Sequence, residues 1–392
     1  MDAKKALHKI ILNNSFSDAF EVRFWDGEII SYGEEKPKFR IVFNTPILSK
    51  DLIKDPFLAL GEGYMTKKID IEGSLQQTLE SLYNNNASFL NSSNRYLKLR
   101  KTLANTIKSS KNNVCHHYDV GNDFYQLWLD ETMTYSCGYF KSPADSLAQA
   151  QKNKVEHILK KLCIKEGQTL LDIGCGWGDL VITAAKEYKV KALGITLSSE
   201  QLAKVKERIE TQNLNDLVDV QLADYRELKS MKFDRIVSVG MLEHVGKECL
   251  SDYFNAVNRL LKSGGVSILH CITRLQEKEM NTWLNKYIFP GGYIPTVQEL
   301  LLHLSDIGFY LIDAESLRRH YAKTVEHWSS NFEDVLSEIS KIKDETFIRM
   351  WRLYLNASAA SFNCGKIDIY QFLFTKGLTN ELPWTREYMY RE

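Results

Sequence analysis

The 392-residue sequence has no apolar run that approaches the roughly 18 residues of a membrane-spanning helix. It also has no excess of charge, because 50 lysines and arginines balance 50 aspartates and glutamates. The balance argues against nucleic acid as a partner and against bulk attraction to an anionic bilayer, so any membrane contact has to be local. Residues 1–5 open no apolar signal-peptide segment, and we expect a cytoplasmic protein.

Cysteine is scarce as well. The chain has seven cysteines, an odd number, and no two of them form a C-x-x-C pair. This scatter argues against both a disulfide framework and a zinc site. We expect free thiols and no metal.

The most informative feature is a glycine cluster that fits neither common phosphate-binding pattern. A short apolar run, residues 170–173, leads into Gly174, Gly176 and Gly178. The dinucleotide pattern G-x-G-x-x-G is absent, no acidic residue ends the next strand candidate, and no Walker A lysine follows. S-adenosylmethionine carries no phosphate and needs only a tight turn beside its amino-acid and ribose groups. The cluster therefore favours an S-adenosylmethionine pocket over a plain strand-to-helix turn.

The residue pattern changes along the chain. Residues 1–92 alternate short strand-like runs with turns, followed by helical stretches near 51–61 and 74–83, which predicts a small α+β domain. From about residue 150, helices and strands alternate, which predicts a doubly wound, mostly parallel Rossmann-like sheet. Its strand candidates are residues 169–173, 191–195, 218–222, 235–239 and 265–272. We expect a helical cap over the pocket, formed by segments near 281–287, 297–305, 322–338 and 345–362.

Between these two regions, residues 94–111 contain six basic residues and no acidic one, while apolar residues recur at helical spacing. The basic residues are Arg95, Lys98, Arg100, Lys101, Lys108 and Lys111. The pattern predicts a basic amphipathic helix. Such a helix either lies on an anionic lipid surface or serves as a solvated linker between domains, and the sequence leaves both open.

Several motifs around the glycine cluster occur together in a characteristic order. They read HYD at 117–119, NDF at 122–124, YSC at 135–137, LDIGCGWG at 171–178, GITLS at 194–198 with Gln201, and MLEHVG at 241–246. In this order, from about residue 114 to the C-terminus and with a further match at 60–65, the chain closely resembles the cyclopropane fatty acid synthases.

The resemblance implies a fold and an activity. It implies a class I methyltransferase domain at 114–392, a basic linker helix at 93–113 and a small lipid-engaging domain at 1–92. Members of the family move the methyl group of S-adenosylmethionine onto the cis double bond of an acyl chain in a membrane phospholipid. A homodimer attached peripherally to the inner face of the membrane is implied as well. Alternatives are a methyl-branching lipid C-methyltransferase, a small-amine N-methyltransferase and a non-catalytic lipid-binding protein.

Ring closure requires a base, since a proton must leave the methyl group after transfer. By resemblance the base is a bound bicarbonate, held by the side chains of Glu243, His270 and Tyr321 and by the backbone N–H groups of Cys137 and Ile272. Glu243 also follows the fourth strand candidate, where ligand contacts are expected in such sheets. A carboxylate beside an anion needs a shared proton or hydrogen bond, so we expect Glu243 to orient the base instead of being it.

The resemblance also assigns the methyl-donor pocket. It implies Tyr135 and Ser136 at the methionine end, Asp172, Gly174 and Gly176 at the glycine turn, Thr196 and Gln201 on the ribose side, and Asp224 and Tyr225 at the adenine. Asp224 follows the third strand candidate, where its carboxylate can accept a hydrogen bond from an adenine amino group.

Overall fold

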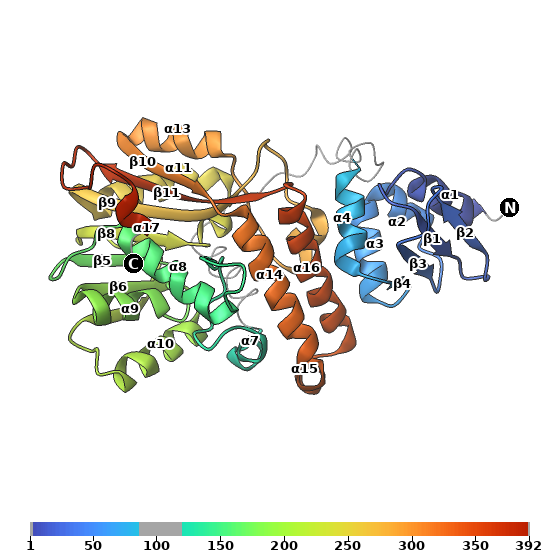
Figure 1. Ribbon diagram of the computed structural model, residues 1–392, viewed down its shortest axis with the longest axis horizontal. Coiled ribbons are helices and arrows are strands. Elements are labelled where there is room, and N and C mark those ends of the chain that lie inside the picture. The colour runs from blue at the N-terminus through green and yellow to red at the C-terminus, as the bar shows by residue number, and fades with distance from the viewer. Residues whose placement is uncertain (1–2, 86–119, 391–392) are drawn as a thin grey trace. The chain divides into compact units, whose positions relative to one another are not determined.

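The computed structural model describes residues 3–85 and 120–390, which form two compact units (Figure 1). Unit 1 comprises Met1–Thr102, Met280–Pro290 and Val325–Lys366, and unit 2 comprises Leu103–Glu279, Gly291–Thr324 and Ile367–Glu392. The basic helix predicted within 93–113 lies outside the described residues.

Unit 2 contains a seven-stranded sheet in the order β10-β11-β9-β8-β5-β6-β7. The strands are β5 (Thr169–Ile173), β6 (Lys191–Thr196), β7 (Val218–Leu222), β8 (Phe233–Val239), β9 (Leu261–Thr273), β10 (Phe309–Ser316) and β11 (Asp368–Lys376). β5 to β9 pair in parallel, whereas β11 runs antiparallel to β9 and β10. The five parallel strands confirm the predicted doubly wound sheet.

Helices cover both faces of this sheet (Figure 1). The helices of unit 2 are α7 (Asn122–Trp128), α8 (Leu147–Lys161), α9 (Asp179–Tyr188), α10 (Ser199–Thr211), η2 (Leu242–His244), η3 (Lys247–Cys249), α11 (Leu250–Leu260), α13 (Val297–Ile307) and α17 (Glu387–Tyr390). One apolar cluster joins the strands to α11 and α13, and a second joins them to α8, α9 and α10. The sheet is thus buried on both sides, and its ligand contacts fall at strand ends.

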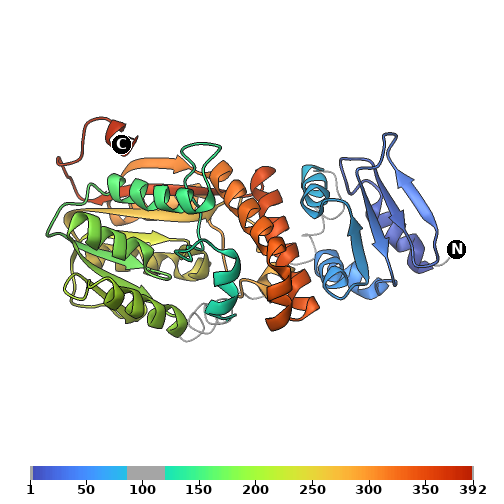
Figure 2. The same cartoon turned by 60° about the horizontal axis from the view of Figure 1, so that its bottom comes forward.

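Unit 1 contains a four-stranded sheet in the order β2-β1-β3-β4 (Figure 2). Its N-terminal elements are α1 (Ala3–Leu12), β1 (Phe20–Arg23), β2 (Ile29–Tyr32), β3 (Phe39–Phe43), α2 (Ser49–Lys54), α3 (Pro56–Met65), β4 (Ile69–Glu72) and α4 (Leu75–Asn84). Residues 51–61, predicted as one helix, are two helices. The break falls at Asp55, because a residue before proline disfavours helical backbone, and its side chain caps α3 by accepting the N–H of Leu58.

The segments expected as a cap are divided between the units. α13 packs against α11 in unit 2, whereas α12 (Thr282–Tyr287), α15 (Leu336–Ile342) and α16 (Glu345–Asn363) belong to unit 1. α14 (Arg318–Asp334) is shared between the units. α16 packs against α3 and α4 of the N-terminal region, so unit 1 is assembled from three separate stretches of the chain. No helix within residues 3–85 and 120–390 combines the length and apolar character needed to cross a membrane.

Candidate active site

A pocket in unit 2 opens beyond the carboxyl ends of the parallel strands and encloses an empty volume of about 1130 Å³. Residues 174–177 after β5, 195–197 at the end of β6, 223–226 after β7 and 239–241 at the end of β8 line it. The chain proceeds from β5 to β6 on one side and returns to place β8 on the other. The pocket therefore lies at the point where the strand order reverses, which is the usual ligand site of such sheets.

The glycine turn after β5 has backbone geometry that other residues rarely adopt. Gly174, Gly176 and Gly178 have φ values of 87°, 54° and 86°. A Cβ atom at Gly174 would lie 2.9 Å from Cγ of Met241, whereas one at Gly176 would meet no atom within 4 Å. Gly174 is thus required by backbone and packing, while Gly176 leaves open space in the pocket.

All nine residues expected to bind the methyl donor line this one pocket. On the predicted ribose side, Thr196 Oγ1 donates to Gln201 Oε1 at 2.7 Å and accepts the N–H of Ser198 at 3.1 Å. At the predicted adenine end, the carboxylate of Asp224 accepts from the guanidinium of Arg226 at 2.7 and 2.8 Å. Sequence reasoning missed Arg226, which lines the pocket two residues further along.

Sequence reasoning also missed a buried lysine in this pocket. Lys154 on α8 is 4% exposed, and its Nζ lies 3.2 Å from Oγ of Ser136. Burial lowers the pKa of Lys154 and raises the pKa of Asp172 to about 7 and that of Asp179 above its ordinary value. The clue was available in the sequence, because α8 carries polar residues on the helical spacing of its buried face: Gln151, Lys154, His157 and Lys161.

Two of the residues expected to hold the proton-accepting anion, Glu243 and Ile272, are in direct contact. Glu243, on η2 just after β8, accepts the backbone N–H of Ile272 through Oε1 at 2.7 Å. Its Oε2 is buried and has no hydrogen-bond partner among the described residues. Burial raises the pKa of Glu243 to about 7. The N–H of Ile272, expected to face the anion, is instead engaged by Glu243.

His270 lies on β9 beside this pair and adjoins the pocket through the backbone. It is fully buried, and burial lowers the pKa of its imidazole to about 3, so the ring is neutral. Gly240, which lines the pocket, donates its N–H to the carbonyl oxygen of His270 at 2.8 Å. Nε2 of His270 is buried without a partner among residues 3–85 and 120–390.

The other imidazole nitrogen of His270 is held by a residue that the sequence did not indicate. Gln371 lies directly opposite His270 in the β9–β11 pairing, and its amide nitrogen lies 3.2 Å from Nδ1. An amide donor at Nδ1 leaves the ring proton on Nε2. His270 therefore carries an Nε2–H group that has no acceptor among the described residues.

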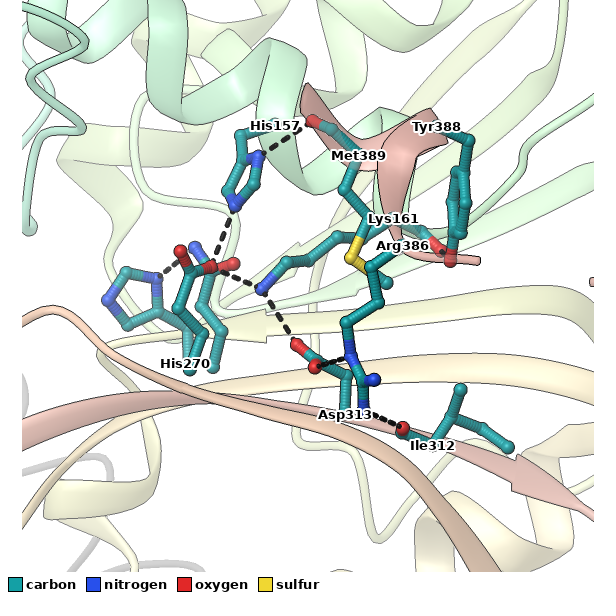
Figure 3. A network of polar contacts seen from close by, with 10 residues as sticks. His157, Lys161, His270, Ile312, Asp313, Arg386, Tyr388 and Met389 are labelled. Carbon is teal, nitrogen blue, oxygen red and sulfur yellow. Dashed lines mark hydrogen bonds and ion pairs between the residues drawn. The ribbon is translucent and has the colours of Figure 1, made fainter. Parts of the chain in front are cut away.

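A charge network with a buried lysine at its centre lies to one side of His270 (Figure 3). Lys161, fully buried on α8, lies 2.5 Å from Glu315 and 3.4 Å from Asp313 of β10. His157 contacts Glu315 at 2.8 Å, and Arg386 binds Asp313 at 2.5 Å. Figure 3 shows Lys161 and Arg386 approaching the same carboxylate. The network ties α8 and the C-terminal segment to the antiparallel edge of the sheet.

The two remaining residues of the predicted anion site share a neighbour. Sγ of Cys137, fully buried, lies 4.0 Å from the carbonyl oxygen of Leu317, and the N–H of Tyr321 donates to the same oxygen at 3.0 Å. Burial raises the pKa of the Cys137 thiol, which stays protonated. The joint action of all five predicted residues on one anion stays a prediction.

The parallel sheet with its antiparallel edge, the glycine turn after β5 and the pocket over the strand-order reversal define a class I S-adenosylmethionine-dependent methyltransferase. The family model described as mycolic acid cyclopropane synthetase matches residues 105–372, and the chain belongs to this family. Residues 7–94 match a second model, described only as a domain of unknown function. The resemblance, the fold class and the class of enzyme are therefore confirmed.

The chain is similar to named relatives over most of its length. It is 37% identical over 380 residues to a probable fatty acid methyltransferase of Pseudomonas putida, covering 94% of this chain and 96% of that protein. It is 41% identical over 271 residues to the cyclopropane-fatty-acyl-phospholipid synthase of Escherichia coli K12, 69% of each chain. Among solved structures, mycolic acid cyclopropane synthase CmaA1 complexed with SAH and CTAB aligns with a TM-score of 0.65 and 35% identity, covering 68% of this chain and 98% of that one.

Proposed function

We propose that this protein transfers the methyl group of S-adenosylmethionine to the cis double bond of unsaturated acyl chains in membrane phospholipids, and that a bound bicarbonate removes the proton that allows a cyclopropane ring to close. The observation that carries this proposal is that Glu243 Oε2 and His270 Nε2 are both buried and have no hydrogen-bond partner among the described residues. Neither residue lines the methyl-donor pocket, but both adjoin residues that do, Met241 and Gly240. Glu243 follows β8 in the chain, and His270 lies on β9 opposite Val239 at the end of β8, which lines that pocket.

The methyl-donor pocket fits S-adenosylmethionine. When bound, this cofactor supplies an electrophilic methyl group on a sulfonium. Asp172, whose buried Oδ1 has no partner among the described residues, offers negative charge to the cationic ligand. Gly176 leaves room for the ligand against bare backbone, and Thr196 and Gln201 are already held by mutual hydrogen bonds. The role of these residues is to bind and orient the methyl donor, since an alkene attacks only in line.

The second group of residues fits a small anion that can both donate and accept hydrogen bonds. Bicarbonate supplies a proton acceptor in a water-poor site. A buried polar atom without a partner is costly, so Glu243 Oε2 and His270 Nε2–H both gain from such a ligand. A pKa of about 7 lets Glu243 share a proton with the anion, while the N–H of Ile272 keeps its carboxylate in place. Tyr321 and the N–H of Cys137 complete the proposed set.

The remaining parts of the proposal concern the membrane. Residues 1–92 engage lipid, residues 93–113 form the linking basic helix, and residues 114–392 carry the catalysis, in a homodimer attached to the inner face of the membrane. Residues 94–111 contain six basic residues and no acidic one, which supports electrostatic contact with anionic lipid. Replacing Lys98, Arg100 and Lys101 by glutamine is expected to weaken binding to phosphatidylglycerol vesicles in a salt-dependent way. Unchanged vesicle binding would mean that residues 94–111 serve only as a linker. The proposed homodimer is tested separately by sedimentation velocity.

The proposed reaction is tested with purified protein, S-adenosylmethionine and vesicles of monounsaturated phosphatidylethanolamine, followed by mass spectrometry and proton NMR of the acyl chains. A mass gain of one methylene with upfield ring protons is expected. The same gain with vinyl or branched-methyl signals would indicate a chain-branching methyltransferase. Acyl chains of unchanged mass would instead favour a small-amine N-methyltransferase.

Two variants connect this reaction to the site. Glu243→Ala and His270→Ala are expected to lose most turnover while the affinity for S-adenosylmethionine, measured by calorimetry, stays unchanged, because these residues serve proton removal and not the methyl donor. Wild-type turnover in either variant would contradict the assignment.

A further inference from the structure

A second pocket lies wholly within unit 1 and is apolar. It lies between the inner face of the four-stranded sheet and helices α3, α4, α12 and α16, and its empty volume of about 970 Å³ includes space that is open to solvent. Among the described residues that line it, none carries a charge. It is separate from the methyl-donor pocket, which is formed by residues of unit 2 alone.

This hollow opens beside the packed core of the N-terminal domain. The sheet contributes Ile41, Phe43 and Ile69, which also belong to the buried apolar cluster of the domain. Protein interiors are packed as densely as organic crystals, and voids larger than a water molecule are few. Phe57, Leu60 and Leu79 border the hollow and are only partly buried, so apolar surface remains available to a ligand.

The wall of the hollow is fixed by contacts between α12, α16 and the N-terminal region. Trp283 of α12 packs on the bare backbone of Gly61, where a Cβ atom would come within 2.5 Å of the indole ring. The indole N–H donates to the sulfur of Met65 at 3.2 Å. On α16, Arg349 donates to the carbonyl oxygens of Tyr64 at 2.5 Å and Ile69 at 2.8 Å. These contacts hold α12 and α16 against the N-terminal region at the border of the hollow.

The polar side chains that border the hollow are already engaged. The hydroxyl of Thr78 donates to the carbonyl oxygen of Ser74, and Oδ1 of Asn281 accepts the N–H groups of Trp283 and Leu284 at the start of α12. A ligand that needs charge or several hydrogen bonds gains little here. A flexible hydrocarbon chain gains from every methylene that leaves water.

We propose that the pocket of unit 1 binds the acyl chain of a lipid, apart from the chain that reacts in unit 2. The proposal rests on the proposed function, which supplies acyl lipid as the molecule that the protein meets. The CmaA1 structure aligns over 98% of its length with only 68% of this chain, and the family model of the synthases begins at residue 105, after the region that matches a separate model. Residues 7–94 therefore add a task beyond methyl transfer, and holding a lipid chain is one that their apolar hollow can perform.

Photocrosslinking tests this proposal with two probes that carry a diazirine near the end of an acyl chain. One is a phosphatidylethanolamine in vesicles and the other a free fatty acid, so the two sources of an acyl chain are distinguished. After irradiation without S-adenosylmethionine, we expect labelled peptides that contain residues 75–83, 281–284 or 353–357. The same labelling in Glu243→Gln separates lipid binding from the proposed chemistry, because this result does not depend on turnover.

Two variants of one helix provide a matched control. Leu79→Trp fills the hollow, whereas Gln77→Trp adds the same side chain on the exposed side of α4. Labelling of unit 1 is expected to fall at least about tenfold in Leu79→Trp and to stay unchanged in Gln77→Trp. Ala357→Phe fills the hollow from α16 and replaces Leu79→Trp if that variant fails to fold. Undiminished labelling of unit 1 in a folded Leu79→Trp or Ala357→Phe variant would overturn the proposal, and so would crosslinks confined to unit 2. Occupation of the hollow by residues 96–107 of the same chain, or by a second copy of the chain, would also overturn it.

Discussion

Glu243→Gln is expected to make the protein more stable at alkaline pH while abolishing its reaction. Burial raises the pKa of the Glu243 carboxyl from 4.5 to about 7 in the folded chain. Between these two pH values the unfolded chain is ionised at this residue and the folded chain is still protonated, so the free energy of unfolding falls as pH rises. Above pH 7 the full cost of about 3 kcal/mol is present, and below pH 4.5 it disappears.

Glutamine keeps the shape of the side chain but cannot ionise. Its Oε1 can still accept the N–H of Ile272, while its amide nitrogen takes the place of the unpartnered Oε2. A buried N–H group without a partner costs about 1 kcal/mol. The variant is therefore expected to be more stable than the wild type by about 2 kcal/mol at pH 8.5 and less stable by about 1 kcal/mol at pH 4.5.

Urea unfolding followed by circular dichroism measures this difference at four pH values between 4.5 and 8.5. The buffers are kept free of bicarbonate, since a ligand that binds only the folded state adds stability. Glu187→Gln, on the exposed face of α9, is the control and is expected to follow the wild type at every pH. A stability difference between Glu243→Gln and the wild type that stays constant with pH would refute the reasoning, because it would mean that the carboxyl ionises equally easily in both states.

Three further substitutions test the site. Gln371→Leu removes the donor to Nδ1 of His270, and turnover is expected to need at least about tenfold more bicarbonate, with unchanged affinity for S-adenosylmethionine. An unaltered bicarbonate dependence would contradict the role of Gln371. Lys154→Met removes the cation near Asp172 and is expected to weaken S-adenosylmethionine binding by about tenfold or more in calorimetry, whereas Lys152→Met on the exposed side of α8 has no effect. Gly174→Ala combines a φ of 87° with a Cβ atom 2.9 Å from Met241. The variant is expected to lose about 2 kcal/mol of stability and to stop binding S-adenosylmethionine. Wild-type affinity for S-adenosylmethionine in this variant would contradict the prediction.

The sequence by itself determined the glycine turn and the five parallel strands, and its resemblance to a known family indicated nine residues that line one pocket. These features depend on short stretches of chain. The spacing of Gly174 and Gly176 specifies a turn, apolar runs specify buried strands, and the carboxyl ends of parallel strands necessarily share one edge of the sheet. Asp224 follows from that rule once the strands are known, whereas Thr196 and Gln201 were implied by the family resemblance.

Only the tertiary structure decided which distant segments meet. Gln371 reaches His270 because β11 inserts antiparallel beside β9, a pairing across about a hundred residues that the helix–strand alternation did not predict. The N–H of Ile272 binds Glu243 because β8 and β9 pair side by side and end close together. Of the segments expected as a cap, α12, α15 and α16 belong to unit 1, where α12 and α16 border an apolar hollow, while α13 belongs to unit 2. Local pattern fixes where each element begins and which face is apolar, but the partner of that face is chosen by packing between segments far apart in the chain.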